Sequence, residues 1–297
     1  MLMESILIQI INGLQSGFLF FLVASGLTII FGVLNILNMT HGAFYMLGAY
    51  LMLTILMPFT EVGPLLFFTV AILVAVIVGL IGSALEFSVV RHIYGRWIPY
   101  QILLTFGLLL IFEDLVRLIW GMVYLSFSRP HSIFGLSEIF GMAYPNYNLM
   151  FIGVGVVIAV LLWLFLHYTR MGRLIRAAAA GPAYREMVWS LGYNVKFLFP
   201  MVFGLGALLA GLGGAIAGPL QTADPMMGLN AIVYSFAVIV IGGLGSLPGA
   251  LIGSIIVGVS RAFAVQYAPV LEMAIVFIIM AIVLIFKPKG LFAKAER

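Results

Sequence analysis

The chain has 297 residues, of which 64% are hydrophobic and only 8% are charged, and its formal net charge is +4. Because a soluble domain carries about 25% charged residues, this composition excludes an ordinary soluble protein and indicates a set of membrane-spanning helices. The chain has no cysteine, which excludes disulfide bonds, thiol catalysis and cysteine metal sites.

Apolar segments that are long enough, or nearly long enough, to cross a bilayer follow one another along the chain. They cover residues 6–31, 39–57, 64–90, 98–120, 147–168, 197–217, 230–241, 250–264 and 269–286. Since a span needs about 20 residues, the segment 230–241 is short, and we interpret it as one part of a broken pair. The sequence therefore predicts an all-α fold, a polytopic membrane helix bundle of eight or nine spans, some of them broken or re-entrant, in one domain that covers residues 1–297. The first 30 residues contain no Lys or Arg, so we expect no cleaved signal peptide.

Small residues recur at every fourth position in several spans. The series are Gly206, Ala210, Gly214 and Gly218, then Ala250, Ser254 and Gly258, and also Gly13 with Gly17. This spacing lets helix backbones approach closely in lipid. We expect it to serve packing within the bundle, although the pattern equally allows a partner helix from another chain.

Basic residues gather in loops on one side of the predicted bundle. Arg91 and Arg96 lie in one such loop, five basic residues lie in the 169–196 loop and four close the chain, whereas only Arg129 lies in a loop on the other side. Because basic loops face the cytosol, this asymmetry predicts a cytosolic C-terminus and a cytosolic 169–196 loop. The outer side then holds Glu4, Glu61, Glu138, Asp224 and the 125–146 loop. The net charge of +4 thus reflects topology, and we expect no nucleic-acid partner.

The 169–196 loop is the longest hydrophilic segment of the chain, and it contains a short helical pattern. Gly181 and Pro182 open this helix and Gly192 closes it. Residues at helical spacing give it one apolar face, which consists of Tyr184, Met187, Val188 and Leu191. A helix of about ten residues is marginal in water by itself, so this face needs a surface on which to dock. The pattern leaves open whether that surface is the same protein, the lipid or a separate protein.

Two apolar stretches contain residues that interrupt helices. The first, GLTIIFGVLNILNMTHGAFYMLGAY at 26–50, carries Asn35, Asn38, Thr40, His41 and Gly42. The second, GGLGSLPGALIG at 242–253, carries Gly242, Gly243, Gly245, Ser246 and Pro248. Such breaks are tolerated at membrane depth only where they face protein or a watery cavity, and transporters use them to line substrate sites. We predict that both stretches line a translocation pathway, and the alternative is that they are two cytosol-facing turns.

Three charged residues lie inside the 98–120 span, namely Glu113, Asp114 and Arg117. Each charge costs at least about 2.5–3.5 kcal/mol near the membrane centre. Their spacing of three and four residues allows an ion pair that offsets much of this cost. We favour a structural ion pair over a substrate contact. A similar pair is expected between Arg261 and Glu272 near the outer end of the last hairpin, and Glu86 lies within reach of Arg91.

Motifs that carry chemistry are absent from the sequence. There is no G-x-x-x-x-G-K-[ST] loop for ATP and no Ser–His–Asp, HExxH or paired-carboxylate arrangement. His41 has no carboxylate at a metal-site spacing. We therefore expect neither an enzyme nor a metal site.

Four stretches resemble one known family. They are the 26–50 stretch, TRMGRLIRAAA at 169–179, AVIVIGGLGSLPGALIG at 237–253 and IFKPKGLF at 285–292. Together they resemble the membrane permeases of branched-chain amino-acid ABC importers, the LivH type, over nearly the whole chain. The resemblance implies as partners two cytosolic ABC ATPases, a second related permease and a periplasmic or surface substrate-binding protein, in the cytoplasmic (inner) membrane of a bacterium or archaeon. ATP and Mg²⁺ would bind to the ATPases, and this chain would hold no cofactor.

The 169–196 loop resembles the coupling segment of ABC importers, whose general pattern is E-A-A-x-x-x-G. Glu186, Met187, Val188 and Gly192 occupy those places, with larger apolar residues in place of the two alanines. The resemblance therefore assigns ATPase coupling to Arg173, Tyr184, Glu186, Met187, Val188, Leu191 and Gly192.

The sequence thus predicts an ATP-driven permease for branched-chain or related apolar amino acids, with membrane lipid around it. Asn38, Thr40 and Ser246 could supply the polar groups that the amino and carboxylate ends of the substrate need. Two alternatives stay open. One is a permease for urea or a short amide, or for aromatic or small carboxylates, and the other is a stand-alone secondary carrier that uses Glu113 or Asp114 for ion coupling.

Overall fold

The computed structural model describes residues 2–127, 133–139, 141–179 and 195–292. Over these residues the chain forms α1 (Leu2–Leu34), α2 (His41–Leu56), α3 (Pro64–Ser88), α4 (Ile98–Trp120), α6 (Asn146–Tyr168), α7 (Arg170–Ala178), α9 (Val195–Ala217), α10 (Met227–Gly242), α11 (Leu247–Tyr267) and α12 (Glu272–Phe286). Two 3₁₀ helices, η1 (Val90–Ile93) and η2 (Pro269–Leu271), and an antiparallel hairpin of β1 (Leu136–Ile139) and β2 (Met142–Pro145) complete the described part.

Each predicted span falls on a helix, and the all-α membrane bundle with broken spans is confirmed. Six described helices are long and apolar enough to cross a membrane, whereas α2 and α10 are apolar but have only 16 residues each. At about 1.5 Å per residue, 16 residues fall short of a hydrocarbon core about 30 Å thick. α4 has 23 residues but carries Glu113, Asp114 and Arg117 in its second half.

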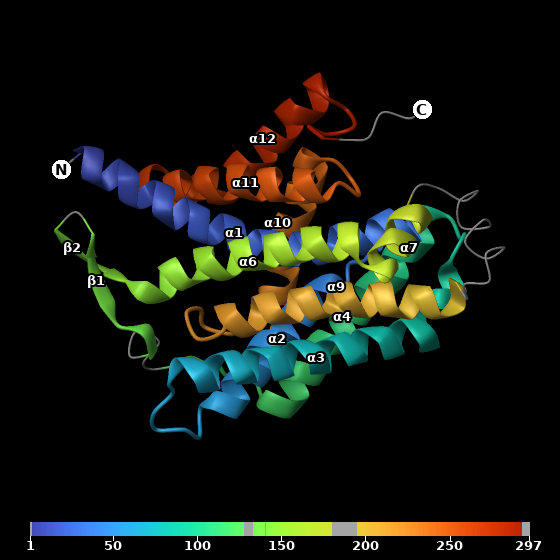
Figure 1. Cartoon of the computed structure of the whole chain (residues 1–297), viewed down its shortest axis with the longest axis horizontal. Coiled ribbons are helices and arrows are strands. Elements are labelled where there is room, and N and C mark those ends of the chain that lie inside the picture. The colour runs from blue at the N-terminus through green and yellow to red at the C-terminus, as the bar shows by residue number, and fades with distance from the viewer. Residues whose placement is uncertain (1, 128–132, 140, 180–194, 293–297) are drawn as a thin grey trace.

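One end of the bundle carries the N-terminal part of α1 and the β1–β2 hairpin (Figure 1). There Gln9 of α1 donates to Gln266 of α11 at 3.1 Å, and Tyr144 of β2 donates to Asn12 of α1 at 2.7 Å. The acidic residues Glu4, Glu61, Glu138 and Glu272 belong to helix starts and connections at this end. This end of the bundle is termed the acidic end.

The opposite end carries α7 and the residues that follow α12 (Figure 1). The backbone N–H of Leu291 donates to the carbonyl of Ile241 at 2.9 Å, which joins the end of the described chain to the end of α10. The described basic residues here are Arg91, Arg96, Arg170, Arg173, Arg176, Lys287 and Lys289. It is termed the basic end, and the charge asymmetry read from the sequence is thus a separation between two ends of the structure.

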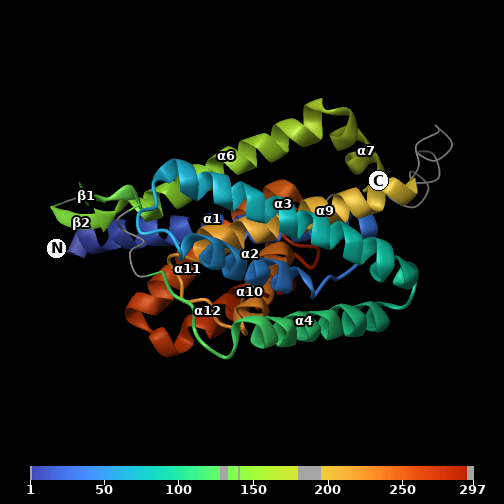
Figure 2. The ribbon, with the colours of Figure 1, turned by 90° about the horizontal axis from the view of Figure 1, so that it is seen from below.

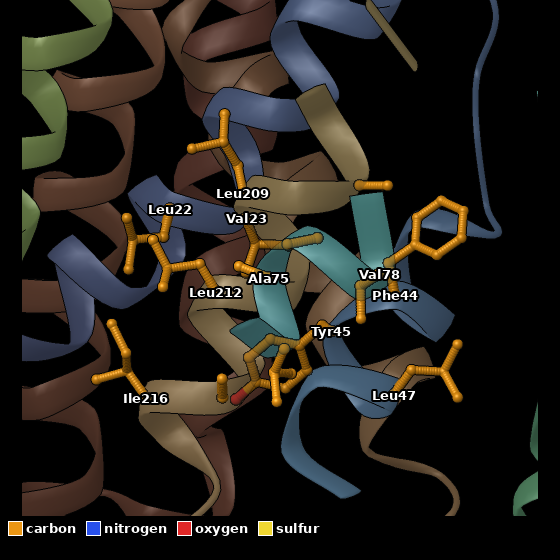
Figure 3. Close-up of a cluster of buried hydrophobic side chains, with 14 of the residues drawn as sticks. Leu22, Val23, Phe44, Tyr45, Leu47, Ala75, Val78, Leu209, Leu212 and Ile216 are labelled. Atoms are coloured by element: carbon orange, nitrogen blue, oxygen red, sulfur yellow. The ribbon is translucent and has the colours of Figure 1, made fainter. Parts of the chain in front are cut away.

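The core gathers around α9, which packs against α1, α2 and α3 (Figure 2). Figure 3 shows side chains from these four helices meeting in one apolar cluster. The small residues predicted to pack the bundle lie at its closest crossings. A Cβ atom at Gly214 would lie 1.8 Å from the carbonyl oxygen of Tyr45, and one at Gly258 would lie 2.3 Å from the amide nitrogen of Gly17. The small-residue spacing therefore serves contacts inside this chain.

Candidate functional site

Two helices, α2 and α10, begin inside the bundle and meet at their first turns. A Cβ atom at Gly42 would lie 2.1 Å from the carbonyl oxygen of Gly228, so the backbones touch where both helices start. The residues before and at the start of α2 (35–42) are termed the α2 junction, and those before and at the start of α10 (218–228) the α10 junction. Residues 35–40 follow the end of α1 at the basic end, whereas residues 218–226 follow the end of α9 at the acidic end. The two junctions therefore enter the bundle from opposite sides.

The α2 junction is closed by contacts with protein. Thr40 Oγ1 donates to the carbonyl of Thr105 at 2.8 Å, and the amide of Met39 donates to Thr105 Oγ1 at 3.1 Å. The His41 ring nitrogen Nε2 lies 2.9 Å from the carbonyl oxygen of Val23, and every residue from 40 to 50 is buried. Asn38 is fully buried, and its side-chain amide has no hydrogen-bond partner among the described residues. Burial of a polar side chain without a hydrogen-bond partner costs free energy, and residues buried in this way in a membrane bundle are typically functional.

The α10 junction borders a cavity of about 550 Å³, termed the acidic-end cavity. Its lining comes from α1, α2, the α10 junction, α10, α11, η2 and α12. The lining residues are Leu19, Phe20, Val23, Tyr45, Gln221, Thr222, Asp224, Met227, Asn230, Ala231, Tyr234, Arg261, Pro269, Val270, Glu272 and Met273. Ligand sites are typically about 300–1,000 Å³ with a few convergent polar groups, and this cavity has such a volume and a lining that is both polar and apolar.

An ion pair lies in the wall of the acidic-end cavity, as the sequence predicted for these two residues. Arg261 Nε of α11 donates to Glu272 Oε1 of α12 at 2.5 Å, and the hydroxyl of Tyr234 donates to the same oxygen at 3.2 Å. The guanidinium carbon lies 5.4 Å from the centre of the Tyr234 ring and 5.9 Å from that of Phe20. The cation is therefore held between a carboxylate and two aromatic rings.

Further polar groups of the cavity come from the α10 junction. Asp224 Oδ1 accepts a hydrogen bond from the amide of Met226 at 2.8 Å, which satisfies a donor at the start of α10. The hydroxyl of Tyr45 donates to Gln221 Oε1 at 3.1 Å. Gln221, Thr222 and Asn230 are exposed, so water reaches this junction.

The residues predicted for the pathway do not line the acidic-end cavity. Asn38, Thr40, His41 and Gly42 lie at the α2 junction. Gly242, Gly243, Gly245, Ser246 and Pro248 lie at the basic end between α10 and α11. Asn35 is exposed and has a positive φ of 54°, and it follows the end of α1. The structure does bring the two stretches together, because a Cβ atom at Gly32 would lie 3.6 Å from Gly245. Their part in a pathway remains a prediction.

Charged residues elsewhere in the spans are paired. Arg117 Nη1 lies 2.9 Å from Asp114 Oδ1, and Arg117 Nη2 lies 3.8 Å from Glu113 Oε2, within α4. At the basic end, Arg91 Nη2 lies 3.5 Å from Glu86 Oε2, and the hydroxyl of Tyr94 also donates to Glu86. Within the described ranges, no three His, Asp or Glu side chains gather as a metal site would require.

The predicted coupling segment is described only in its first part. Tyr184, Glu186, Met187, Val188, Leu191 and Gly192, with the predicted 181–192 helix, lie outside the described residues. Arg173 lies in α7, a helix that the sequence reading took as loop, and its Nη1 donates to the carbonyl of Tyr168 at 3.2 Å. Thr169 Oγ1 accepts from the amide of Gly172 at 2.9 Å and caps α7. A Cβ atom at Gly172 would lie 2.1 Å from the carbonyl oxygen of Phe165, so α7 folds back tightly on α6.

The sequence reading missed the acidic-end cavity and the break at the α10 junction. It assigned Asp224 only to the outer side and the Arg261–Glu272 pair only to the last hairpin. A signal was present, because Pro219, Asp224 and Pro225 separate α9 from the short segment already interpreted as half of a broken pair.

Comparison with known proteins gives a consistent result. A family model described as branched-chain amino acid transport system / permease component matches residues 9–285. The high-affinity branched-chain amino acid transport system permease protein LivH of Escherichia coli K12 is 27% identical over 97% of this chain and 96% of its own length. The corresponding protein BraD of Pseudomonas aeruginosa is 26% identical over the same shares. A probable branched-chain amino acid transport permease protein LivH of Methanocaldococcus jannaschii is 28% identical over 83% of this chain and 77% of its own length. No solved structure matches the chain significantly.

Proposed function

Because this chain belongs to the family of permease components of branched-chain amino acid transport systems, we propose that it forms the membrane pathway of an ATP-driven importer of branched-chain or related apolar amino acids. The observation that carries the proposal is the family match over residues 9–285, which covers every described spanning helix in whole or in most of its length. The similar proteins are transport permeases and not enzymes. ATP hydrolysis would therefore occur on partner subunits, where ATP and Mg²⁺ bind.

The basic end faces the cytosol in this proposal. Its support is the separation of charge, since Arg91, Arg173 and Lys287 lie at one end while Glu4 and Glu138 lie at the other. Loops rich in Lys and Arg remain on the cytosolic side during membrane insertion. The acidic-end cavity then opens on the outer half of the membrane, where a substrate-binding protein would deliver its ligand.

ATPase docking is assigned to the 169–196 loop. α7 supports this role, because its capped start and its tight packing on α6 give the loop a rigid entry. The arginines Arg170, Arg173 and Arg176 are spaced three residues apart along α7. We expect the ATPases to move the 181–192 segment and to transmit that movement to the bundle through α7.

A second related permease and lipid would cover the remaining apolar flanks. α6 and α12 expose most of their spans, with 22% and 6% of those segments buried in this chain. Side chains such as Leu161 of α6 and Ile285 of α12 are exposed. Apolar surface of this extent is stable only against lipid or another membrane subunit.

The alternative of a secondary carrier has less support from the structure. Such a carrier would need an acid that exchanges protons or ions, and Glu113 and Asp114 are the acids of the membrane interior that the sequence offers. Both lie within ion-pair distance of Arg117, so each has a structural task.

Isolation of the intact complex from its native membrane tests the proposal. We expect this chain to purify with two ATPase subunits, a second permease and a binding protein. Glu186→Ala and Gly192→Leu in the coupling segment should each lower ATP-driven leucine uptake at least tenfold and weaken retention of the ATPases. The matched control is Glu138→Ala, on an exposed strand at the acidic end, which should leave uptake unchanged. Normal uptake and normal ATPase retention in both coupling variants would overturn the docking assignment.

A further inference from the structure

The acidic-end cavity places a cation and an anion side by side in its lining, which also contains apolar side chains. We propose that it is a substrate site that binds the zwitterionic head of an apolar amino acid, with Arg261 binding the carboxylate and Glu272 binding the ammonium group. This inference rests on the proposed function and extends it, because it names the residues that contact the substrate and the chemical class that they select.

The spacing of the two charges matches the head of an α-amino acid. Arg261 Nε and Glu272 Oε1 are 2.5 Å apart, and an α-amino acid likewise carries its two charges on a single carbon. Arginine has five N–H donors, and this bond uses one of them. A substrate carboxylate can therefore bind the Nη edge of the guanidinium, which is the planar, two-bond geometry that arginine favours.

Glu272 also retains capacity for a ligand. The two hydrogen bonds that the structure records for this carboxylate, from Arg261 and from Tyr234, both end on Oε1. A carboxylate accepts on both oxygens, so Oε2 remains for an ammonium group. Asp224 adds a second negative charge to the same cavity, although its Oδ1 already accepts a hydrogen bond from the amide of Met226. The cavity lining thus carries one positive and two negative groups, and an anion without an amino group would bind poorly.

The remaining lining suits an aliphatic side chain. Leu19, Phe20 and Val23 of α1 form one wall, and Met227 and Ala231 of α10 form another. Removal of apolar surface from water is favourable, so these side chains favour leucine, isoleucine or valine over glycine. Urea and short amides have neither an ammonium group nor a carboxylate, so they would leave the Arg261–Glu272 pair without a ligand of matching charges. The cavity chemistry therefore favours the amino acid over the amide.

A purely structural ion pair is the competing explanation for Arg261 and Glu272. It would hold α11 to α12, and its loss would weaken the binding of every ligand to the same degree. A substrate site predicts something different, because removal of either charge should change which ligands bind. The experiment is therefore built on ligand discrimination.

The absence of cysteine in this chain makes site-specific labelling direct. Thr222→Cys and Asn230→Cys place one thiol each on exposed positions of the cavity lining, and Ser137→Cys on β1 gives a matched exposed control at the same end. The complex is reconstituted in liposomes, its leucine uptake is measured, and it is then treated with a membrane-impermeant maleimide. Labelling is scored on the band of this chain alone, with L-leucine, 4-methylpentanoate or 3-methylbutylamine present.

Each ligand is titrated, and we expect L-leucine to halve the labelling rate of Thr222→Cys and Asn230→Cys at a concentration at least fivefold lower than either analogue, each of which lacks one of its two charges. Labelling of Ser137→Cys should be unchanged by all three. Arg261→Gln, made in the Thr222→Cys background, removes the group that binds the carboxylate, so leucine should protect no better than 3-methylbutylamine, which has no carboxylate. Glu272→Gln removes the group that binds the ammonium, so leucine should protect no better than 4-methylpentanoate, which has no ammonium group. Asp224→Asn, which keeps an oxygen that can accept from the amide of Met226, should weaken leucine protection only about twofold to threefold.

Two results would overturn the site. One is a complex that takes up leucine although neither cavity thiol is labelled, or although leucine protects neither of them from labelling. This result would leave the proposed function intact. The other is an equal loss of protection for all three ligands in Arg261→Gln and Glu272→Gln, which shows a structural pair. A complex that assembles with its ATPases but takes up no apolar amino acid would instead remove the proposed function, and the site with it.

Discussion

The α2 and α10 junctions solve the same problem in two different ways. Each starts a helix inside a membrane bundle, and each must satisfy the backbone groups that the break frees. The α2 junction does so with protein contacts, since Thr105 of α4 accepts hydrogen bonds from Met39 and Thr40. Every residue from 40 to 50 is buried. The α10 junction uses its own Asp224 and an open, polar cavity. A helix break is therefore not by itself a binding site, and we propose that only the break that borders the open cavity serves substrate.

The contact between the two junctions should be the most sensitive point of the comparison. Gly42→Leu would drive a side chain into the Gly228 backbone, because even its Cβ atom would lie 2.1 Å from that carbonyl oxygen. Overpacking costs typically about 1–3 kcal/mol, and a clash with backbone that cannot move should exceed this range. We expect little folded protein, as measured by fluorescence-detected size-exclusion chromatography.

The control for this change is Gly153→Leu in α6, where an added Cβ atom meets no atom within 4 Å. It should leave the elution profile unchanged. A normal profile for Gly42→Leu would show that the two helix starts are farther apart than the structure has them.

The closed character of the α2 junction is tested by Thr105→Val. This change leaves the partly buried amide of Met39 without its side-chain acceptor, beside a residue 105 that is fully buried. An unsatisfied buried donor costs about 1–3 kcal/mol, so the midpoint of thermal unfolding should fall by several degrees.

Thr69→Val is the matched control, because its hydroxyl donates to the carbonyl of Leu65 on an exposed face of α3. Its unfolding midpoint should stay within about a degree of the unchanged protein. Equal midpoints for the two variants would mean that water replaces the lost bond at the α2 junction, which would remove the contrast between the junctions.

The open character of the α10 junction is tested by Gln221→Ala, which should have the smallest effect. The change removes the acceptor of the Tyr45 hydroxyl, but Gln221 is exposed and lines the cavity, so water can take its place. A hydrogen bond replaced by water changes stability by less than about 1 kcal/mol. Thermal unfolding should show almost no shift, whereas a fall as large as that of Thr105→Val would mean that the junction is dry.

The sequence predicted the fold well because apolar length is a strong signal in a membrane protein. The apolar segments and the separation of basic residues from acidic ones appear in the structure, and the eight or nine predicted spans correspond to six described helices long enough to cross a membrane with two shorter apolar ones. The first break was also found, since Asn38, Thr40 and His41 stand out against an apolar background. The paired charges of α4 followed from helical spacing alone.

The site could not be read in the same way. Arg261 and Tyr45 are 216 positions apart in the chain, and no periodicity indicates that they share a cavity. The Gly- and Pro-rich stretch at 242–248 gave a stronger local signal than residues 218–226, although the structure places it at the basic end. Glycine and proline report a break in the backbone, but only tertiary packing determines whether that break is open to water.

We propose that this chain forms a pathway for apolar amino acids that is driven by ATPases at its basic end. Uptake of radiolabelled leucine into liposomes that hold the purified complex tests this proposal, with ATP on the side of the basic end and the binding protein on the other side. We expect uptake that requires ATP and stops when the ATPase subunits are omitted. Uptake that persists without them and follows an imposed proton or sodium gradient would contradict this proposal.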